Sequence, residues 1–307
     1  MLRYFTGRLL AAIPTLLVLV TLAFVMMRAA PGGPFDSEHM LQPEIRANLE
    51  RMYHLDEPLL AQYGRYLGNL VRGDLGPSYK YPDWTVNELI AAGLPVSLLL
   101  GGLAMLIALF AGFAAGAFAA LRQNSAGDHA VMGVAMTGIS VPTFVTAPLL
   151  ILIFAVYAGI LPAGGWNGGA WRNLVLPVAV LALPQIAYIA RLTRGAMIEV
   201  LRSDYIRTAR AKGLRTRAIV LRHALKPSLL PVVSYLGPAV AAVLTGSLVV
   251  EQIFGLPGIG RYFIQGALNR DYTLVMGVVV FYGAFVIAMN LVVDLLYAWL
   301  DPQVRYR

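Results

Sequence analysis

The chain has 307 residues, of which 58% are hydrophobic and only 13% are charged, and it carries a net charge of +8 and no cysteine. Soluble globular proteins carry about 25% charged residues, so this composition predicts a membrane protein with several spans. The lack of cysteine excludes disulfides, thiolate metal sites and cysteine catalysis. The excess of positive charge does not indicate a nucleic-acid partner, because Lys and Arg concentrate in cytoplasmic loops and near anionic lipid.

The first apolar segment is an uncharged run of 19 residues from Leu9 to Met27, preceded by two arginines. A signal peptide would have an apolar region of about 7–15 residues and then a small-residue cleavage site. This run is longer, and it ends in two methionines and an arginine. We therefore expect residues 1–30 to form an N-terminal tail and a retained first transmembrane helix, since about 20 residues span a bilayer.

Residues 31–92 differ in kind, because they hold most of the acids of the chain and many of its aromatic residues. The spacing predicts one helix from Pro43 to Tyr53 and a second from Pro58 to Val71, followed by a turn from Gly73 to Pro77. The apolar residues of the second helix should share one side: Leu59, Leu60, Tyr63, Leu67 and Leu70. We expect a small folded domain outside the membrane.

Five further uncharged runs predict five more spans, so that residues 93–307 form a five-helix membrane core in an all-α protein with six transmembrane helices. The runs are Gly93–Leu121, Ala130–Val156, Asn173–Ala190, Ser228–Val250 and Tyr272–Val293. Prolines within them indicate either a transport pathway or simple kinks. Gly112 and Gly116 form a close-contact pair, for which packing within one subunit is favoured over a dimer interface.

The stretch from Arg191 to Lys226 is the one long polar segment among these runs, with ten Lys or Arg against two acids. Steps of three and four predict two short amphipathic helices around a turn at Gly213. Their expected apolar faces are Ile198, Leu201, Tyr205 and Ala209, then Leu214, Ala218, Leu221 and Leu225. The distribution of Lys and Arg predicts that this stretch and both termini are cytoplasmic, and that the 31–92 domain and the 251–271 loop face outward.

No motif for a chemical reaction is visible. There is no Gly-Lys dipeptide of a Walker A loop, no histidine pair with metal-ligand spacing and no Ser-His-Asp motif. The spans also lack the midplane ionisable groups of ion-coupled transporters. We therefore expect no enzyme, no cofactor and no metal site, and an energy source that acts through the basic segment. The alternatives are an intramembrane enzyme, which needs paired catalytic groups, and a passive channel or scaffold, which needs no basic coupling segment.

The segment from Tyr205 to Gly213, Tyr-Ile-Arg-Thr-Ala-Arg-Ala-Lys-Gly, resembles the EAA loop of the permease subunits of ABC importers. Arg207-Thr208-Ala209 stands where the family has Glu-Ala-Ala, and Gly213 stands at its glycine. His223 and Lys226 replace the family's later Ile and Pro. These departures are similar to those of the peptide-permease branch, whose Arg-His-Ala-Leu is present here at 222–225.

The likeness to this branch extends over nearly the whole chain. Similar stretches are Tyr53–Leu59, Arg72–Gly76, Leu161–Gly168, Glu251–Gly260 and Asp294–Pro302. The loops Trp166–Gly169 and Asn269–Tyr272 make the chain most similar to oligopeptide permease B-type subunits. Dipeptide, glutathione or nickel transport by the same class of transporter is the alternative.

The resemblance implies the type I ABC importer permease fold in a bacterial inner membrane. It implies as partners a second permease subunit, two cytoplasmic ATPases that carry ATP and Mg, a periplasmic peptide receptor and membrane lipid, with no nucleic acid. Oligopeptides would move from the periplasm to the cytoplasm.

The 198–226 hairpin would couple this chain to an ATPase, with Ala209 allowing a close seat, Gly213 making the turn and the arginines pairing with carboxylates or with anionic lipid. The coupling residues would be Tyr205, Arg207, Thr208, Ala209, Arg210, Ala211, Gly213, Leu214 and Arg215. Residues facing the receptor or an external gate would be Tyr53, Trp84, Trp166, Asn167, Glu251, Gly255, Pro257, Gly258, Gly260 and Asp271. The external domain could instead be a lid that only packs on the spans.

Overall fold

The computed structural model describes residues 2–29, 32–35 and 43–300. Regular structure within these ranges is helical, with one isolated bridge between Pro77 and Thr85, which confirms the all-α class. Residues 36–42 of the expected external domain, and the Asp301-Pro302 end of the resemblance, lie outside the described residues.

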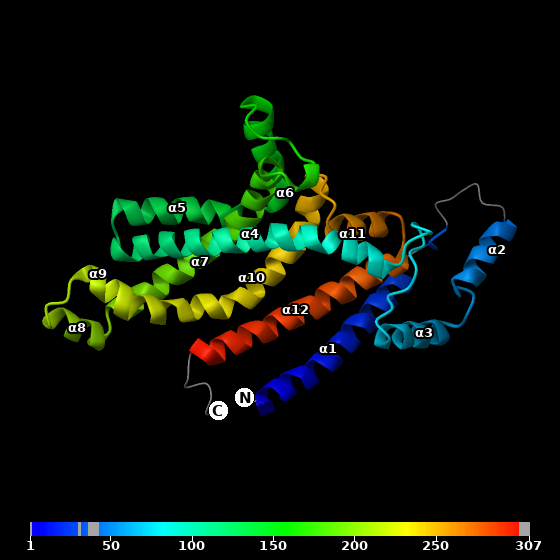
Figure 1. Cartoon of the computed structure of the whole chain (residues 1–307), viewed down its shortest axis with the longest axis horizontal. Helices are drawn as coiled ribbons and strands as arrows, with labels where there is room; N and C mark the ends of the chain where they lie inside the picture. Colours follow the sequence, from blue (N-terminus) through cyan, green and yellow to red (C-terminus); the bar gives the residue numbers. More distant parts are fainter. Residues whose placement is uncertain (1, 30–31, 36–42, 301–307) are drawn as a thin grey trace. The chain divides into compact units, whose positions relative to one another are not determined.

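Five helices within the described ranges are long and apolar enough to cross a membrane (Figure 1). They are α1 (Leu2–Ala29), α4 (Val86–Leu121), α7 (Trp171–Leu201), α10 (Leu225–Ile253) and α12 (Tyr272–Leu300). Each contains one of the expected spans, and most extend beyond it by several residues. The apolar runs therefore identified these helices but not their ends.

The expected third span is broken. It consists of α5 (Ala126–Ser140), then α6 (Thr143–Leu150) continued by a π-helical turn η1 (Ile151–Tyr157), and the two parts are bent by 107°. Val141 adopts an extended backbone with φ −96° and ψ 117°, as a residue before proline prefers, and Pro142 begins the next helix. The structure thus has six spans only if this bent pair counts as one.

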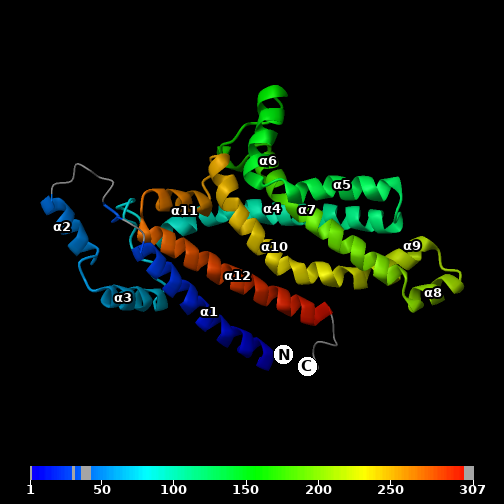
Figure 2. The ribbon, with the colours of Figure 1, turned by 180° about the vertical axis from the view of Figure 1, so that it is seen from behind.

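The described chain divides into two compact units, and α4 and α12 contribute to both. The first unit contains residues 97–256 and the chain from residue 286 onward. In it α5, α6 and α10 pack on α7, as the views from both sides show (Figures 1 and 2). Ala108 of α4, Ile189 of α7 and Val232 of α10 are buried together.

Gly112 and Gly116 lie where α4 meets α7. A Cβ atom added at Gly116 would be 2.4 Å from the carbonyl oxygen of Ala190, and one at Gly112 would be 2.8 Å from that of Ile186. Such distances leave no room for any side chain larger than hydrogen. The prediction that this glycine pair serves packing within one subunit is confirmed.

The second unit contains residues 2–96 and 257–285. It contains the short helices α2 (Pro43–Met52) and α3 (Leu59–Val71), close to the predicted ranges, and α11 (Ile259–Leu268), which lies in the later loop. The buried core joins the starts of α4, α11 and α12 through Val86, Ile259 and Leu274.

The predicted apolar side of α3 is wrong at its start. Leu60 is 85% exposed and Leu59 is also exposed, whereas Gln62 is buried. The Gln62 amide nitrogen donates to the carbonyl oxygens of Leu55 and Glu57, at 3.1 and 2.7 Å. These bonds satisfy the turn before the helix, so a polar residue takes a position that spacing alone assigns to leucine.

Candidate functional site

The basic segment forms a helical hairpin that leaves α7 at a sharp turn. Helix α7 ends at Leu201, and α8 (Asp204–Ala211) begins only three residues later, after Ser203 at its N-cap. Asp204 in the first turn of α8 is favourable beside the positive end of the helix dipole, and it pairs with Arg207 one turn on. The short link ties the position of α8 directly to that of α7.

Helix α8 ends in a Schellman motif, which confirms the predicted turn at Gly213. Gly213 has φ +77°, its N–H donates to the Arg210 carbonyl at 2.9 Å, and the Leu214 N–H donates to the Ala209 carbonyl at 3.3 Å. A Cβ atom at Gly213 would meet no heavy atom within 4 Å. The position therefore needs glycine for its backbone conformation and not for space.

The second arm of the hairpin is not the separate amphipathic helix that the spacing predicted. Helix α9 (Thr216–Ile219) continues through a π-helical turn η3 (Val220–Ala224) into α10, so that one helical stretch runs from Thr216 to Ile253. The π turn shifts the register, and Leu221 of the expected apolar face is 62% exposed. The hairpin is thus continuous with a membrane span.

A small apolar cluster holds the two arms together. Ile206 and Ala209 of α8 and Ile219 of α9 are buried, with Val200 of α7 packed against them. Tyr205, which the spacing assigned to this face, is 48% exposed instead. Ala209 was expected to make a close packing contact with an ATPase. In this structure it packs within the chain's own hairpin, where its small side chain lets α8 approach α9.

The outward surface of the hairpin carries the rest of the predicted coupling set. Eight of the nine residues are exposed: Tyr205, Arg207, Thr208, Arg210, Ala211, Gly213, Leu214 and Arg215. Ala209 is the one that is buried. The surface combines guanidinium groups with an exposed tyrosine and leucine, which suits contact with a protein.

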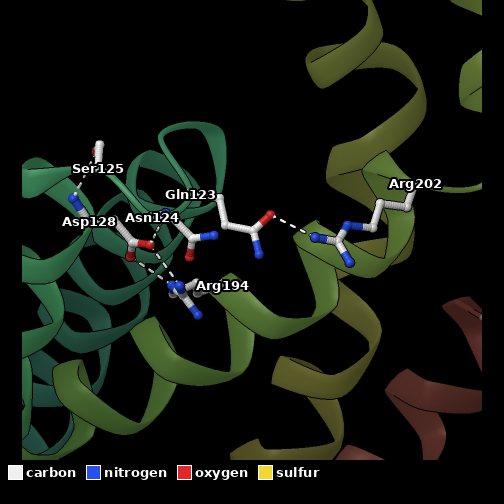
Figure 3. Close-up of polar contacts among 6 residues, drawn as sticks. All are labelled: Gln123, Asn124, Ser125, Asp128, Arg194 and Arg202. Atoms are coloured by element: carbon white, nitrogen blue, oxygen red, sulfur yellow. Dashed lines mark hydrogen bonds and ion pairs between the residues drawn. The ribbon is translucent and has the colours of Figure 1, made fainter.

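An ion pair that the sequence did not reveal joins α5 to α7, the helix that leads into the hairpin (Figure 3). Arg194 of α7 donates from Nε to Oδ1 of Asp128 at 2.7 Å and from Nη2 to Oδ2 at 2.6 Å. Asp128 is fully buried and also accepts from the Asn124 N–H at 2.9 Å. The Ser125 hydroxyl caps α5, accepting from the Asp128 N–H at 3.3 Å. The loop after α4 is thereby joined to α7.

A second contact lies nearer the hairpin. Arg202, directly after the last residue of α7, donates to Oε1 of Gln123 at 3.0 Å (Figure 3). Sequence reasoning counted Arg194 and Arg202 among the ten basic residues of the segment from Arg191 to Lys226 and predicted no partner for either. The Ser125-x-x-Asp128 pattern, a capping box in form, was the available signal that this loop is ordered.

The predicted external residues of the first unit include a buried carboxylate. Glu251 is fully buried and accepts a hydrogen bond from the Ser97 hydroxyl at 2.7 Å. It is therefore not on the surface in this structure, and of its two predicted roles, receptor contact and external gate, the gate stays a prediction. Gly255 is exposed with φ +63°, and Asn167 is exposed with φ +43°. Trp166 is half-buried and its ring lies over Gly169.

In the second unit Asp271 is likewise buried. One carboxylate oxygen accepts from the N–H groups of Tyr79 and Lys80, at 3.0 and 3.2 Å, and from the Ser78 hydroxyl. The other caps α12 by accepting from the Leu274 N–H at 3.1 Å. Asp271 therefore joins the loop before α4 to the start of α12. Because it is buried, the external-gate part of its predicted role is the part that stays a prediction.

The remaining residues of the predicted external set belong to the same unit. Tyr53 packs on Tyr79 with ring centroids 4.7 Å apart, and burial raises the pKa of Tyr79 to about 12. Gly258 and Gly260 are buried at the start of α11, and Pro257 is half-buried. Trp84 is 48% exposed. Among the residues described, no three His, Asp or Glu side chains are grouped so that they could hold a metal ion.

Comparison with known proteins gives matches over the whole chain. The family model of the binding-protein-dependent transport system inner membrane component matches residues 112–306. The oligopeptide transport system permease protein OppB of Salmonella typhimurium is 56% identical over 306 residues, 100% of each chain. The dipeptide transport system permease protein DppB of Bacillus subtilis is 47% identical over 305 residues, 99% of this chain and 98% of the relative.

A solved structure supports the fold. The MetNI methionine ABC transporter in an inward-facing conformation gives a TM-score of 0.57 at 16% identity, covering 69% of this chain and 96% of that one. At this identity the likeness concerns the fold alone. With its apolar helices, the protein is a multi-pass inner-membrane component of a transport system. The resemblance read from the EAA-like segment is confirmed: the chain belongs to the family of binding-protein-dependent transport system inner membrane components and has the type I ABC importer permease fold.

Proposed function

We propose that this chain is the B-type permease subunit of an ATP-driven importer that carries oligopeptides into the cytoplasm. The observation that carries the proposal is 56% identity to an oligopeptide permease over the full length of both chains. The exposed hairpin supports it, because a permease needs a surface through which a separate ATPase can act. The chain itself would bind no cofactor, and ATP and Mg would be held by the partner ATPases.

Coupling would pass through both arms of the hairpin. Helix α8 follows α7 after two intervening residues, and α9 is continuous with α10. A partner that displaces α8 would therefore displace two spans together, and α5, α6 and α10 pack on α7. ATP binding that favours the closed ATPase pair would shift the population of inward-open and outward-open states through these contacts.

The proposed assembly contains a second, different permease subunit, two ATPases and a periplasmic receptor. The hairpin and both termini would lie in the cytoplasm, and the 31–92 domain would lie outside. In that orientation Trp84, Asn167 and Gly255 are the exposed members of the external set and the candidates for receptor contact. Replacing Trp84 by Ser should then reduce receptor-stimulated ATP hydrolysis more than basal hydrolysis. Equal losses would favour a lid that only packs on the spans.

The substrate is tested by uptake of labelled peptides of graded length into proteoliposomes that contain the whole transporter. We expect saturable, ATP-dependent uptake of peptides longer than two residues. Uptake confined to dipeptides would favour the alternative that the transporter carries dipeptides, which the 47% identity to a dipeptide permease supports. Absence of any ATP-dependent peptide uptake by a fully assembled complex would overturn the proposal.

A further inference from the structure

An open cavity of about 470 Å³ lies between the end of α4, the last turn of α7 and the hairpin. Three arginines are among its lining residues, Arg122, Arg202 and Arg210. The apolar side chains of Ile198, Leu201 and Ile219 line it as well. All of these residues belong to the first compact unit. The cavity therefore combines strong positive charge with an apolar wall.

The positive charge of this cavity is not balanced within the described part of the chain, where no carboxylate pairs with any of the three arginines. Arg202 donates to the neutral amide oxygen of Gln123, and the guanidinium carbon of Arg122 lies 4.6 Å from the ring centre of Phe118. Arg194 nearby is different, because Asp128 neutralises it (Figure 3). A cavity with three such groups attracts an anion from outside the chain.

The position of the arginines points to the kind of anion. Arg122 directly follows the last residue of α4, where the uncharged run of that helix ends, and the hydrogen bond from Arg202 to Gln123 holds the end of α7 beside it. Basic pockets between membrane helices at that level suit phospholipid head groups. Guanidinium groups bind phosphate oxygens in paired hydrogen bonds, and the apolar wall suits the hydrocarbon next to a head group.

We propose that this cavity binds the phosphate head group of an anionic phospholipid, with its first hydrocarbon segments against Ile198, Leu201 and Ile219. A carboxylate of a partner protein is the less favoured occupant, because a carboxylate pairs with the arginines but leaves the apolar wall uncovered, whereas a phospholipid covers both. The bound lipid would bridge Arg122 of the inter-span loop and Arg210 of the hairpin. It would thereby hold α8 in a fixed position relative to the ends of α4 and α7.

The test is native mass spectrometry of the purified transporter in neutral detergent, titrated with phosphatidylglycerol and, in parallel, with phosphatidylcholine. The double variant Arg122→Gln/Arg202→Gln should bind phosphatidylglycerol about 30-fold more weakly, since each basic side chain contributes about fivefold at a membrane surface. The matched control is Arg217→Gln/Arg222→Gln, which removes the same charge from exposed positions outside the cavity. It should stay within about threefold of the wild type.

Two further variants keep the test independent of folding. The substitutions Arg122→Lys/Arg202→Lys preserve the charge and should retain most of the binding. Thr216→Trp places a large ring in the cavity without removing a charge, and it should weaken binding as the glutamine pair does. Glycerol phosphate at millimolar concentration should not displace the lipid.

Three results would overturn the proposal. Equal weakening in the cavity variant and in the exposed control would mean that only net charge matters. Full binding by Thr216→Trp would place the lipid elsewhere. Displacement of the lipid by glycerol phosphate at millimolar concentration would identify a site for free phosphate compounds instead.

Discussion

Replacing Gly213 by Val isolates the backbone requirement of the hairpin. A side chain at this position meets no heavy atom within 4 Å, so no packing is lost. The residue has φ +77°, where a residue with a Cβ atom is strained by about 1–3 kcal/mol. If the turn relaxes instead, the two hydrogen bonds of the Schellman motif are lost, which also costs about 1–3 kcal/mol in total.

Either route lowers the population of the native hairpin by about 5- to 150-fold relative to its alternatives. Gly213 is exposed and lies outside the membrane spans, so insertion and membrane levels of the subunit should stay normal. We expect the ATPases to be lost on purification, or to be retained while ATP hydrolysis is no longer tied to peptide uptake. The assay is peptide uptake by proteoliposomes, with the ATPase content of the same complex quantified.

Two comparison variants test whether the backbone conformation at Gly213 is the cause of the lost uptake. Gly213→Asn should be milder, because Asn tolerates a positive φ better than a β-branched residue does. Gly195→Val in α7 is the matched control, since a Cβ atom there also meets no heavy atom within 4 Å but the backbone is ordinary helix. Near-normal uptake by Gly213→Val, or an equal loss in Gly195→Val, would refute the reasoning.

Three further predictions test other parts of the structure. Ala209→Asp puts a carboxylate into the buried cluster of the hairpin, which destabilises the hairpin by several kcal/mol if the carboxylate stays unpaired, so purified complexes should contain less ATPase. Unchanged ATPase content would contradict the role of the cluster. Gly116→Val should lower the melting temperature and the yield through overpacking of about 1–3 kcal/mol or more, while Gly102→Val, which has open space, should not. An impermeant thiol reagent applied from outside should label Trp84→Cys and not Thr216→Cys, both exposed positions in a chain without cysteine; the reverse pattern would invert the proposed orientation.

Several features of this protein follow from the sequence because they depend on local properties. A long uncharged run must become a helix in a membrane, since no water satisfies its backbone, and the runs located the spans without any knowledge of their neighbours. The turn at Gly213 was predictable because a helix end favours a left-handed glycine. The match of Arg207–Gly213 to the EAA pattern gave the family for the same reason, since the motif is continuous in the chain.

Only the tertiary structure decided which side chains meet. Helical spacing assigned Tyr205 to the hairpin core, but Ile206 lies there, packed with Ile219 of the second arm, and Tyr205 is exposed. Asp128 and Arg194 are 66 residues apart in the sequence, so no local pattern predicts that they pair. The resemblance placed Asp271 and Glu251 among residues that face a receptor or an external gate, and the structure shows that each is buried with hydrogen-bond donors from distant segments. Such partners are set by how helices pack, and packing is a property of the whole chain.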